Sequence, residues 1–396
     1  MVGSIGSNYK IMRTNERQIS LATGTLQVRV QASAFALDAL CGFAARANEK
    51  RGFLFLSKVL GKHWPATPSA MREIHAFLAA RLALGASPCV FIALAETATG
   101  LGQGVFEAAK QRWPSSEALF IHSTRYRIEG HQALSFQEAH CHAPEQLLYL
   151  PTEPKLRRMF QCARELVLID DEITTGNTLC NVVEAYQRIN PHLERVFFLS
   201  IANFSGPDLE QHCSQRLGLA VDGIAALHGR FWFTPDSAYR FPEHAPPAVG
   251  DNRLARTDLA LDLGRLGTDR LLRLPPAQIA ALARGLRQDD PVLVLGTGEF
   301  MHLAFCVGEA LEALGLRVFV QSTTRSPLLI GADVEQRLVF ADNYREGIAN
   351  YLYNAVPEAY ARIILCHETP RAGLASLRQR LGRDHLCYTP RLNTLA

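Results

Sequence analysis

The sequence predicts an α/β protein with a parallel sheet in each half of the chain. Short apolar runs that fit buried strands alternate with segments long enough for a helix, and strands separated in this way normally join one parallel sheet through crossover helices. In the first half these runs lie at residues 90–95, 118–121, 166–169 and 196–201, and in the second half at residues 292–295, 318–320 and 363–365.

A Pro-rich stretch at residues 241–250 separates the two halves and contains Pro242, Pro246 and Pro247. A chain of 396 residues with 48% hydrophobic and 20% charged residues has a globular composition and the length of two domains. We therefore predict one domain over residues 20–240 and a second over residues 251–396.

Charge and composition limit the classes of partner. The 41 basic and 38 acidic residues give a formal net charge of +3, and no Lys/Arg run of the kind that binds nucleic acid or a membrane surface occurs. The nine cysteines form no CxxC pair, and neither a leader-like apolar core nor a membrane-length apolar run is evident. We expect a cytoplasmic protein that binds small molecules rather than nucleic acid or membranes, and a homodimer is compatible with the sequence.

The segment at residues 166–178 joins a predicted strand to a helix, whose apolar face is predicted at Leu179, Val182, Val183 and Tyr186. Free backbone N–H groups and hydroxyls at the start of a helix bind anions such as phosphate. Two adjacent carboxylates before them suit the diol of a ribose, directly or through Mg²⁺. The residues concerned are Asp170, Asp171, Thr174, Thr175, Gly176, Asn177 and Thr178.

This segment resembles the phosphoribosyl pyrophosphate (PRPP) motif of the type I phosphoribosyltransferases, in which a hydrophobic strand precedes two acidic residues and a Gly- and hydroxyl-rich turn ending in Thr. The resemblance implies a type I phosphoribosyltransferase-like parallel sheet, with PRPP as donor and Mg²⁺ as cofactor. Asp170 and Asp171 would be catalytic residues that engage the ribose hydroxyls and Mg²⁺, and the turn from Thr174 would bind the 5-phosphate. An Asp-capped helix of another α/β protein is the alternative.

The resemblance also implies a pyrophosphate loop after the strand at residues 90–95. Arg125, after the next strand, stands where these enzymes often keep a basic catalytic residue, although a solvated arginine is an alternative. The loop is the less typical motif, so an ordinary strand-to-helix turn is also considered. Its residues are Glu96, Thr97, Ala98, Thr99 and Gly100.

The reaction implied is transfer of ribose 5-phosphate to a small, nitrogenous base-like acceptor with release of pyrophosphate. Relatives that use 6-oxopurines usually carry an acidic base at the position of Thr174, so a threonine there favours an orotate-like pattern. Two alternatives remain open: a regulatory protein that binds PRPP or a nucleotide without catalysis, and phosphorolysis in the reverse direction.

The second half contains a Gly-Thr-Gly turn at residues 296–298 and a Thr-Arg-Ser-Pro sequence at residues 324–327. Met301 in the third glycine position and Gln321 at the next strand's end argue against a Rossmann cofactor site. Together with the PRPP motif, the Thr-Arg-Ser-Pro sequence resembles bacterial phosphoribosyltransferases of tellurite-resistance and stress gene clusters, in which a TRSP domain follows the transferase.

The two halves share an order of features, because a strand, a loop, a helix, a strand and a Thr-Arg pair (Thr124-Arg125 and Thr324-Arg325) precede a further strand in each. We hypothesise that the second domain is a degenerate copy of the first. Two other segments are left open. The basic and aromatic segment at residues 50–63 is either a ligand contact or a solvated edge. Residues 136–143 have the position of a closing loop, and His140 and His142 within them are acid/base or acceptor contacts, metal ligands, or packed or solvated histidines.

Overall fold

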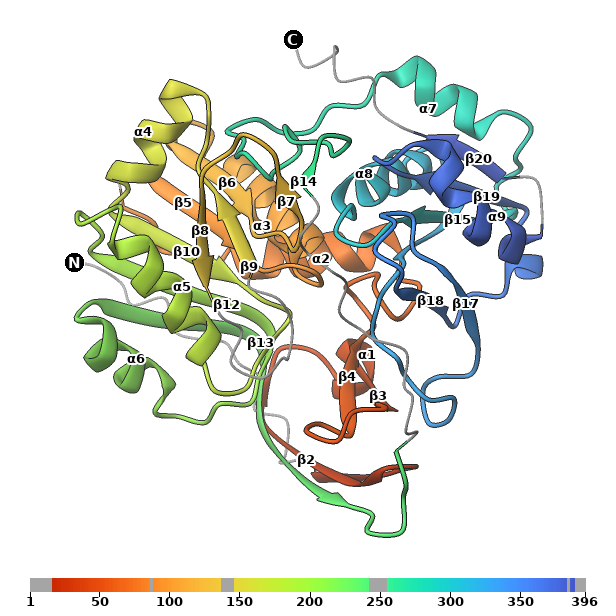
Figure 1. The fold of residues 1–396 in the computed structure, drawn as a ribbon, viewed down its shortest axis with the longest axis horizontal. Coiled ribbons are helices and arrows are strands. Elements are labelled where there is room, and N and C mark those ends of the chain that lie inside the picture. The colour runs from red at the N-terminus through yellow and green to blue at the C-terminus, as the bar shows by residue number, and fades with distance from the viewer. Residues whose placement is uncertain (1–15, 86–87, 137–145, 242–254, 383–384, 389–396) are drawn as a thin grey trace.

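A computed structural model describes residues 16–85, 88–136, 146–241, 255–382 and 385–388 of the chain. It contains a mostly parallel sheet in the first half of the sequence and a parallel sheet in the second half, which lie to the left and right in Figure 1. The predicted α/β class is therefore confirmed. Among the described residues, no helix has both the length and the apolar character needed to cross a membrane.

The first sheet has the strand order β1-β2-β13-β12-β10-β5-β6. All four predicted strands form and are mutually parallel: β5 (Cys89–Ala93), β6 (Ala118–His122), β10 (Glu165–Ile169) and β12 (Arg195–Asn203). β11 (Glu172–Ile173) also pairs with β12. Ala93 and Ile169 are register partners at the carboxyl ends of β5 and β10, so the loops that follow these two strands begin side by side.

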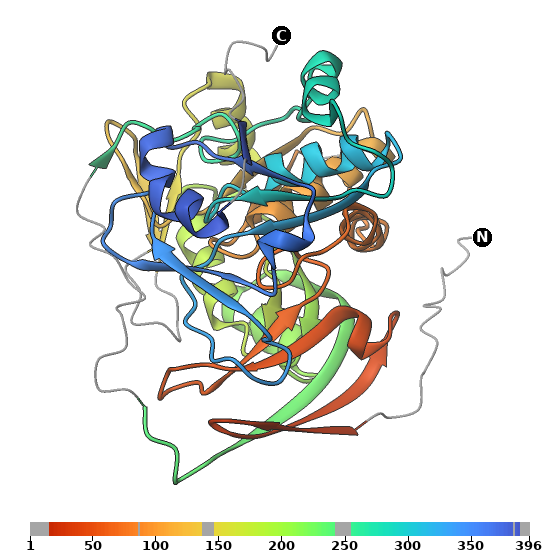
Figure 2. The same cartoon turned by 90° about the vertical axis from the view of Figure 1, so that its right-hand side faces the viewer.

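Strands that the sequence analysis did not predict extend this sheet. β13 (Ala220–Pro235) runs parallel to β12 and antiparallel to β2 (Gly24–Ser33), and β1 (Glu16–Leu21) pairs with β2. The ends of β2 and β13 reach beyond the helices at the lower side of the molecule, near the hairpin of β3 (Cys41–Ala45) and β4 (Phe53–Ser57), as Figures 1 and 2 show. The short helix α1 (Leu37–Leu40) precedes that hairpin.

Both faces of the first sheet are covered, which explains why the central strands are continuous apolar runs. Phe91 and Ala93 pack in one core with α2 (Pro68–Ala79) and α3 (Thr99–Arg112). Val90 and Ile92 point to the opposite core, which contains α4 (Pro154–Cys162), α5 (Asn177–Gln187) and α6 (Leu209–Leu217). The predicted helix face at residues 179–186 belongs to this second core, on α5.

Three short strands, β7 (Arg127–Ile128), β8 (Ala133–Phe136) and β9 (Gln146–Tyr149), follow β6.

The second sheet has the order β16-β15-β19-β20, and all its strands are parallel. They are β15 (Pro291–Gly296), β16 (Arg317–Ser322), β19 (Arg362–Cys366) and β20 (His385–Tyr388). Around them lie α7 (Pro276–Ala283), α8 (His302–Glu312), α9 (Ala375–Leu381) and the hairpin of β17 (Arg337–Ala341) and β18 (Ala349–Tyr353). Short 3₁₀ helices occur at η1 (Pro357–Ala359) and η2 (Arg371–Leu374).

The two sheets repeat one topology. The order β12-β10-β5-β6 corresponds to β20-β19-β15-β16. The crossover helix α3 connects β5 to β6 in the first sheet, and α8 connects the corresponding strands β15 and β16 in the second. Thr124-Arg125 follows β6 and Thr324-Arg325 follows β16. The matching strand order supports the hypothesis of an internal duplication.

The predicted domain boundary at residues 241–250 lies almost wholly outside the described residues. After the gap, β14 (Ala255–Arg256) pairs with β7, and Thr268 forms a bridge with Phe120 at the edge of the first sheet. A segment of the first half packs in return on the second sheet, where Ala66 bridges Val320. The halves therefore exchange segments, and each contributes side chains to the other's core.

A buried arginine holds charged groups together where the halves meet. Arg265 is 1% exposed, its Nη1 lies 2.5 Å from Glu368 Oε2, and its Nη2 lies 3.1 Å from Glu299 Oε2. Burial would lower the pKa of this guanidinium, but the charges of Glu368 and Glu299 raise it instead. One cation thus neutralises much of the charge of two carboxylates in a water-poor environment.

We expect Arg265→Gln to lower the free energy of unfolding by about 3–5 kcal/mol, because removal of one partner leaves buried carboxylates uncompensated. Urea unfolding followed by circular dichroism measures the change. Arg270→Gln is the control: the side chain of Arg270 is 64% exposed, and its loss should cost at most about 0.5 kcal/mol. Equal effects of the two substitutions would contradict the importance of the buried network.

Candidate functional site

The predicted phosphate turn lies between β10 and α5, at the carboxyl edge of the first sheet. Gly176 caps α5 with a φ of 72°, and a Cβ on it would lie 2.5 Å from Leu209 of α6. The left-handed backbone conformation therefore favours glycine here, and a Cβ would also displace the end of the Leu209 side chain. Thr175 and Asn177 are exposed, whereas Asp170, Asp171, Thr174 and Thr178 are partly exposed, so a ligand can reach the turn.

The acidic pair and the predicted pyrophosphate loop come together in the structure. Thr97 Oγ1 donates a hydrogen bond to Asp171 Oδ1 over 2.7 Å. Asp171 N donates to Asp170 Oδ1 over 3.0 Å, which orients the first carboxylate. Because β5 and β10 are neighbours, two loops that are more than seventy residues apart in sequence form one site.

The side chain of Glu96 has a different environment from the rest of this loop. It is 7% exposed, and its carboxylate lies 2.7 Å from Lys62 Nζ and 3.6 Å from Arg325 Nε. Burial alone would raise the pKa of Glu96, but the charges of Lys62, Arg325 and Arg125 lower it to about 2. Glu96 therefore stays ionised and holds the loop in place through its ion pairs with Lys62 and Arg325. Contacts of the loop with a ligand would then be made by residues 97–100 rather than by the Glu96 side chain.

The second domain contacts the far end of the same loop. Thr99 Oγ1 donates to the Glu299 carbonyl oxygen over 2.8 Å, and a Cβ on Gly100 would lie 3.0 Å from the Met301 side chain. Ala98 is fully buried beside them. Residues 98–100 are thus held by packing, and the part of the loop nearest the acidic pair is Thr97.

Arg125 follows β6, the strand next to β5. Its backbone N donates to Glu299 Oε1 over 2.8 Å, and Thr124 Oγ1 donates to Glu299 Oε2 over 2.6 Å. The Arg125 guanidinium is close enough to help lower the pKa of Glu96. The structure therefore places this predicted basic residue on the pyrophosphate-loop side of the site rather than in bulk solvent.

The Thr-Arg-Ser-Pro segment of the second domain lies at the interface between the halves. Arg325 is 6% exposed, and its Nη2 lies 2.6 Å from both Glu346 Oε2 and the Tyr126 hydroxyl. Together with its ion pair to Glu96, these contacts join the motif to the first domain. The sequence analysis did not predict this contact, because no local pattern says which loop an arginine will face.

Residues 50–63 are neither a solvated edge nor remote from the site. Arg51 Nη2 lies 2.5 Å from Glu172 Oε1, directly after the acidic pair, and Lys62 is buried against Glu96. Both basic groups therefore support the two loops through ion pairs. The expected closing loop with His140 and His142 lies almost entirely outside the described residues.

The chain matches two sequence families in succession. Residues 40–230 match the family described as "Phosphoribosyl transferase", and residues 262–380 match the family described as "TRSP domain C terminus to PRTase_2". No curated protein matches the chain.

Solved structures with similar folds include adenine phosphoribosyltransferases. That of Trypanosoma brucei, in complex with AMP, pyrophosphate and ribose-5-phosphate, is 16% identical, with 47% of this chain and 76% of that chain covered and a TM-score of 0.34. The enzyme of Leishmania tarentolae is 15% identical, with 48% of this chain and 85% of that chain covered and a TM-score of 0.33. The enzyme of Rhodothermus marinus is 14% identical, with 48% of this chain and 96% of that chain covered and a TM-score of 0.31. Such low values carry no argument about substrate.

The order of the two family matches along the chain agrees with the order of the PRPP motif and the Thr-Arg-Ser-Pro motif. This protein therefore belongs to the phosphoribosyltransferases that carry a C-terminal TRSP domain, and it is an enzyme of the glycosyltransferase class.

Proposed function

We propose that the protein transfers ribose 5-phosphate from PRPP to a small nitrogenous base-like acceptor and releases pyrophosphate. The observation that carries the proposal is the hydrogen bond between Thr97 and Asp171, which joins a phosphate-binding type of loop to an acidic pair at one edge of the sheet. Open α/β sheets bind ligands at this carboxyl edge.

The 5-phosphate would lie against the turn before α5. The backbone amides at the start of this helix and the hydroxyls of Thr174, Thr175 and Thr178 are suitable donors for a phosphate dianion. Gly176 lets the backbone approach closely, and Asn177 begins the helix. Five consecutive residues would thereby hold the non-reacting end of the donor.

The ribose would lie over Asp170 and Asp171, whose carboxylates accept hydrogen bonds from its two hydroxyls. These partly exposed oxygen ligands also fit Mg²⁺, which when bound would neutralise charge on the pyrophosphate. Two carboxylates beside the sugar favour the positive charge that develops at the anomeric carbon as its C–O bond breaks.

The departing pyrophosphate would lie between the loop at residues 96–100 and Arg125. The Arg125 guanidinium would stabilise the negative charge that collects on the leaving group, and Thr97 would hold the loop against the acidic pair. The electron pair of the broken C–O bond goes to pyrophosphate, and the acceptor's nucleophilic atom takes its place on the anomeric carbon.

Four finer parts of the hypothesis belong with this proposal. Thr174 supplies no carboxylate to remove a proton from the acceptor, so the acceptor would carry its own nucleophilic lone pair. We also propose a cytoplasmic location, a homodimer and a role in tellurite-resistance clusters. The alternative activity is a PRPP or nucleotide sensor, in which the same carboxylates bind without turnover.

Turnover distinguishes these activities. With PRPP, Mg²⁺ and a panel of nitrogenous bases and aromatic acids, we expect acceptor-dependent release of pyrophosphate, measured by a coupled phosphate assay. Binding of PRPP without release for any acceptor would favour the sensor. Base release that depends on added pyrophosphate and a nucleotide would instead favour phosphorolysis.

The double substitution Asp170→Asn with Asp171→Asn should weaken Mg²⁺-dependent PRPP binding by more than about 100-fold, because two charge-assisted hydrogen bonds are lost. Calorimetry measures the affinity, and circular dichroism checks the fold. Asp208→Asn, an exposed carboxylate that makes no cap hydrogen bond before α6, is the control and should bind normally. Unchanged affinity in the double variant would remove these carboxylates from the site.

Arg125→Gln should raise the dissociation constant for inorganic pyrophosphate by about 10- to 100-fold, the effect of losing one hydrogen bond to a charged group. Arg127→Gln is the matched control, because Arg127 is exposed on β7, two residues further along. If both variants bind pyrophosphate like the parent protein, Arg125 does not serve the leaving group.

A further inference from the structure

Four polar side chains face one another between α3 of the first domain and α8 of the second. Gln103 and Glu107 lie four residues apart on α3, and His302 and Cys306 lie four residues apart on α8. Side chains with this spacing share one face of a helix. None of the four belongs to the predicted PRPP site.

Three of these side chains bring potential metal ligands together. Glu107 Oε1 lies 2.9 Å from His302 Nε2, Cys306 Sγ lies 3.3 Å from the same nitrogen, and all three ligand atoms lie within 4.8 Å of one another. Ligands bound at about 2.0–2.3 Å to a tetrahedral ion are separated by roughly 3–4 Å. The cluster therefore has nearly the spacing of a bound set. It is the one such group among the residues that the structure describes.

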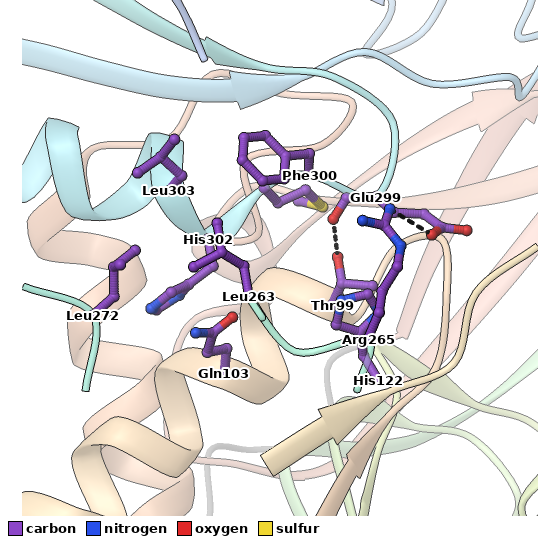
Figure 3. Close-up of a pocket in the computed structure, with 11 residues that line it drawn as sticks. Thr99, Gln103, His122, Leu263, Arg265, Leu272, Glu299, Phe300, His302 and Leu303 are labelled. Carbon is purple, nitrogen blue, oxygen red and sulfur yellow. Dashed lines mark hydrogen bonds and ion pairs between the residues drawn. The ribbon is translucent and has the colours of Figure 1, made fainter. Parts of the chain in front are cut away.

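The fourth side chain, Gln103, lies at the same place and has no hydrogen-bond partner in the described part of the chain. Gln103 is 3% exposed, and its amide makes no hydrogen bond to any described residue. It lines a cavity of about 10 Å³ together with His302, and Figure 3 shows the amide and the imidazole ring side by side. This volume suits roughly one water molecule or one ligand atom.

The hydrogen bond between Glu107 and His302 accounts for only half of this arrangement. It leaves a buried thiol beside the imidazole and the buried Nδ1 of His302 without a hydrogen-bond partner among the described residues, which normally costs free energy. Burial and the Glu107 carboxylate raise the pKa of Cys306, so a thiolate forms here only beside a cation. Burial would raise the pKa of Glu107, but His302 lowers it, so its carboxylate is available as a ligand.

We propose that Glu107, His302 and Cys306 bind one transition-metal ion of the Zn²⁺ class, with its fourth position open to the cavity beside Gln103. One thiolate, one imidazole and one carboxylate form a mixed ligand set that suits Zn²⁺ or Co²⁺ and is unsuited to Mg²⁺. On binding, the Cys306 thiol loses its proton to solvent, and the two ligand anions balance the charge of the ion.

The ion would connect the two domains directly. Glu107 comes from the helix that begins in the predicted pyrophosphate loop, whereas His302 and Cys306 come from the corresponding helix of the second sheet. The site is separate from the proposed transferase chemistry, so it can be tested without a known acceptor.

Metal-free full-length protein titrated with Co²⁺ alone should bind one equivalent and develop a thiolate-to-cobalt charge-transfer band, which Zn²⁺ then removes by displacement. Cys306→Ser should lose that band. Glu107→Gln and His302→Gln should each weaken binding by more than about 100-fold, beyond the 10- to 100-fold effect of losing an outer partner. Zn²⁺ should raise the melting temperature of the parent protein and not of these variants.

Cys162→Ser is the control, because Cys162 is an exposed thiol on α4 and the natural candidate for adventitious cobalt binding. It should keep the band and the affinity. The proposal is overturned if the parent protein shows no band, if the band persists in Cys306→Ser, or if Cys162→Ser removes it. Should Cys306→Ser fail to fold, the nearly isosteric Glu107→Gln decides: unchanged Co²⁺ affinity in that variant also overturns the site.

Discussion

The carboxylate of Glu299 is the interaction on which the arrangement of the two halves depends. It accepts hydrogen bonds from the Thr124 hydroxyl and the Arg125 backbone and pairs with Arg265, while being only 3% exposed. A buried charge is tolerated only where several donors meet it. The carboxyl end of β6 is thus fixed to a residue of the second domain, and the position of Arg125 follows from a contact made 174 residues later in the chain.

The same geometry explains why the equivalent loops of the two sheets meet. The loop after β5 contacts the loop after β15 through Thr99 and Glu299, and Lys62 donates to the Gly298 carbonyl while pairing with Glu96. If the halves arose by duplication, the second copy kept its strand order, and the loops at the carboxyl edge of its sheet now lie in an internal interface. Its Thr-Arg-Ser-Pro segment then supports the first domain's loop, which gives a physical role to a domain that lacks the acidic pair.

The sequence allowed the central strands and the turn between β10 and α5 to be predicted, because both depend on local pattern. β10 is a continuous apolar run, and the turn after it combines Asp, Thr and Gly at helix-start spacing. The alternation of Leu26, Val28 and Val30 with polar residues is also typical of a strand, although the sequence analysis did not predict β2. The ion pairs of Glu96 could not be predicted, because they join segments whose proximity is set only by packing of one domain on the other.

The path of the chain after the gap at residues 242–254 has a consequence for stability of the first half alone. Phe120 N donates to the Thr268 carbonyl and His122 N donates to the Gly264 carbonyl, so residues of the second half occupy the hydrogen-bonding groups along the outer side of β6. A fragment ending near residue 240 would leave the outward-facing amides of Phe120 and His122 and the Phe120 carbonyl unpaired, and such an open edge invites pairing with another chain. By covering this edge strand, the second half protects the first half from edge-to-edge aggregation.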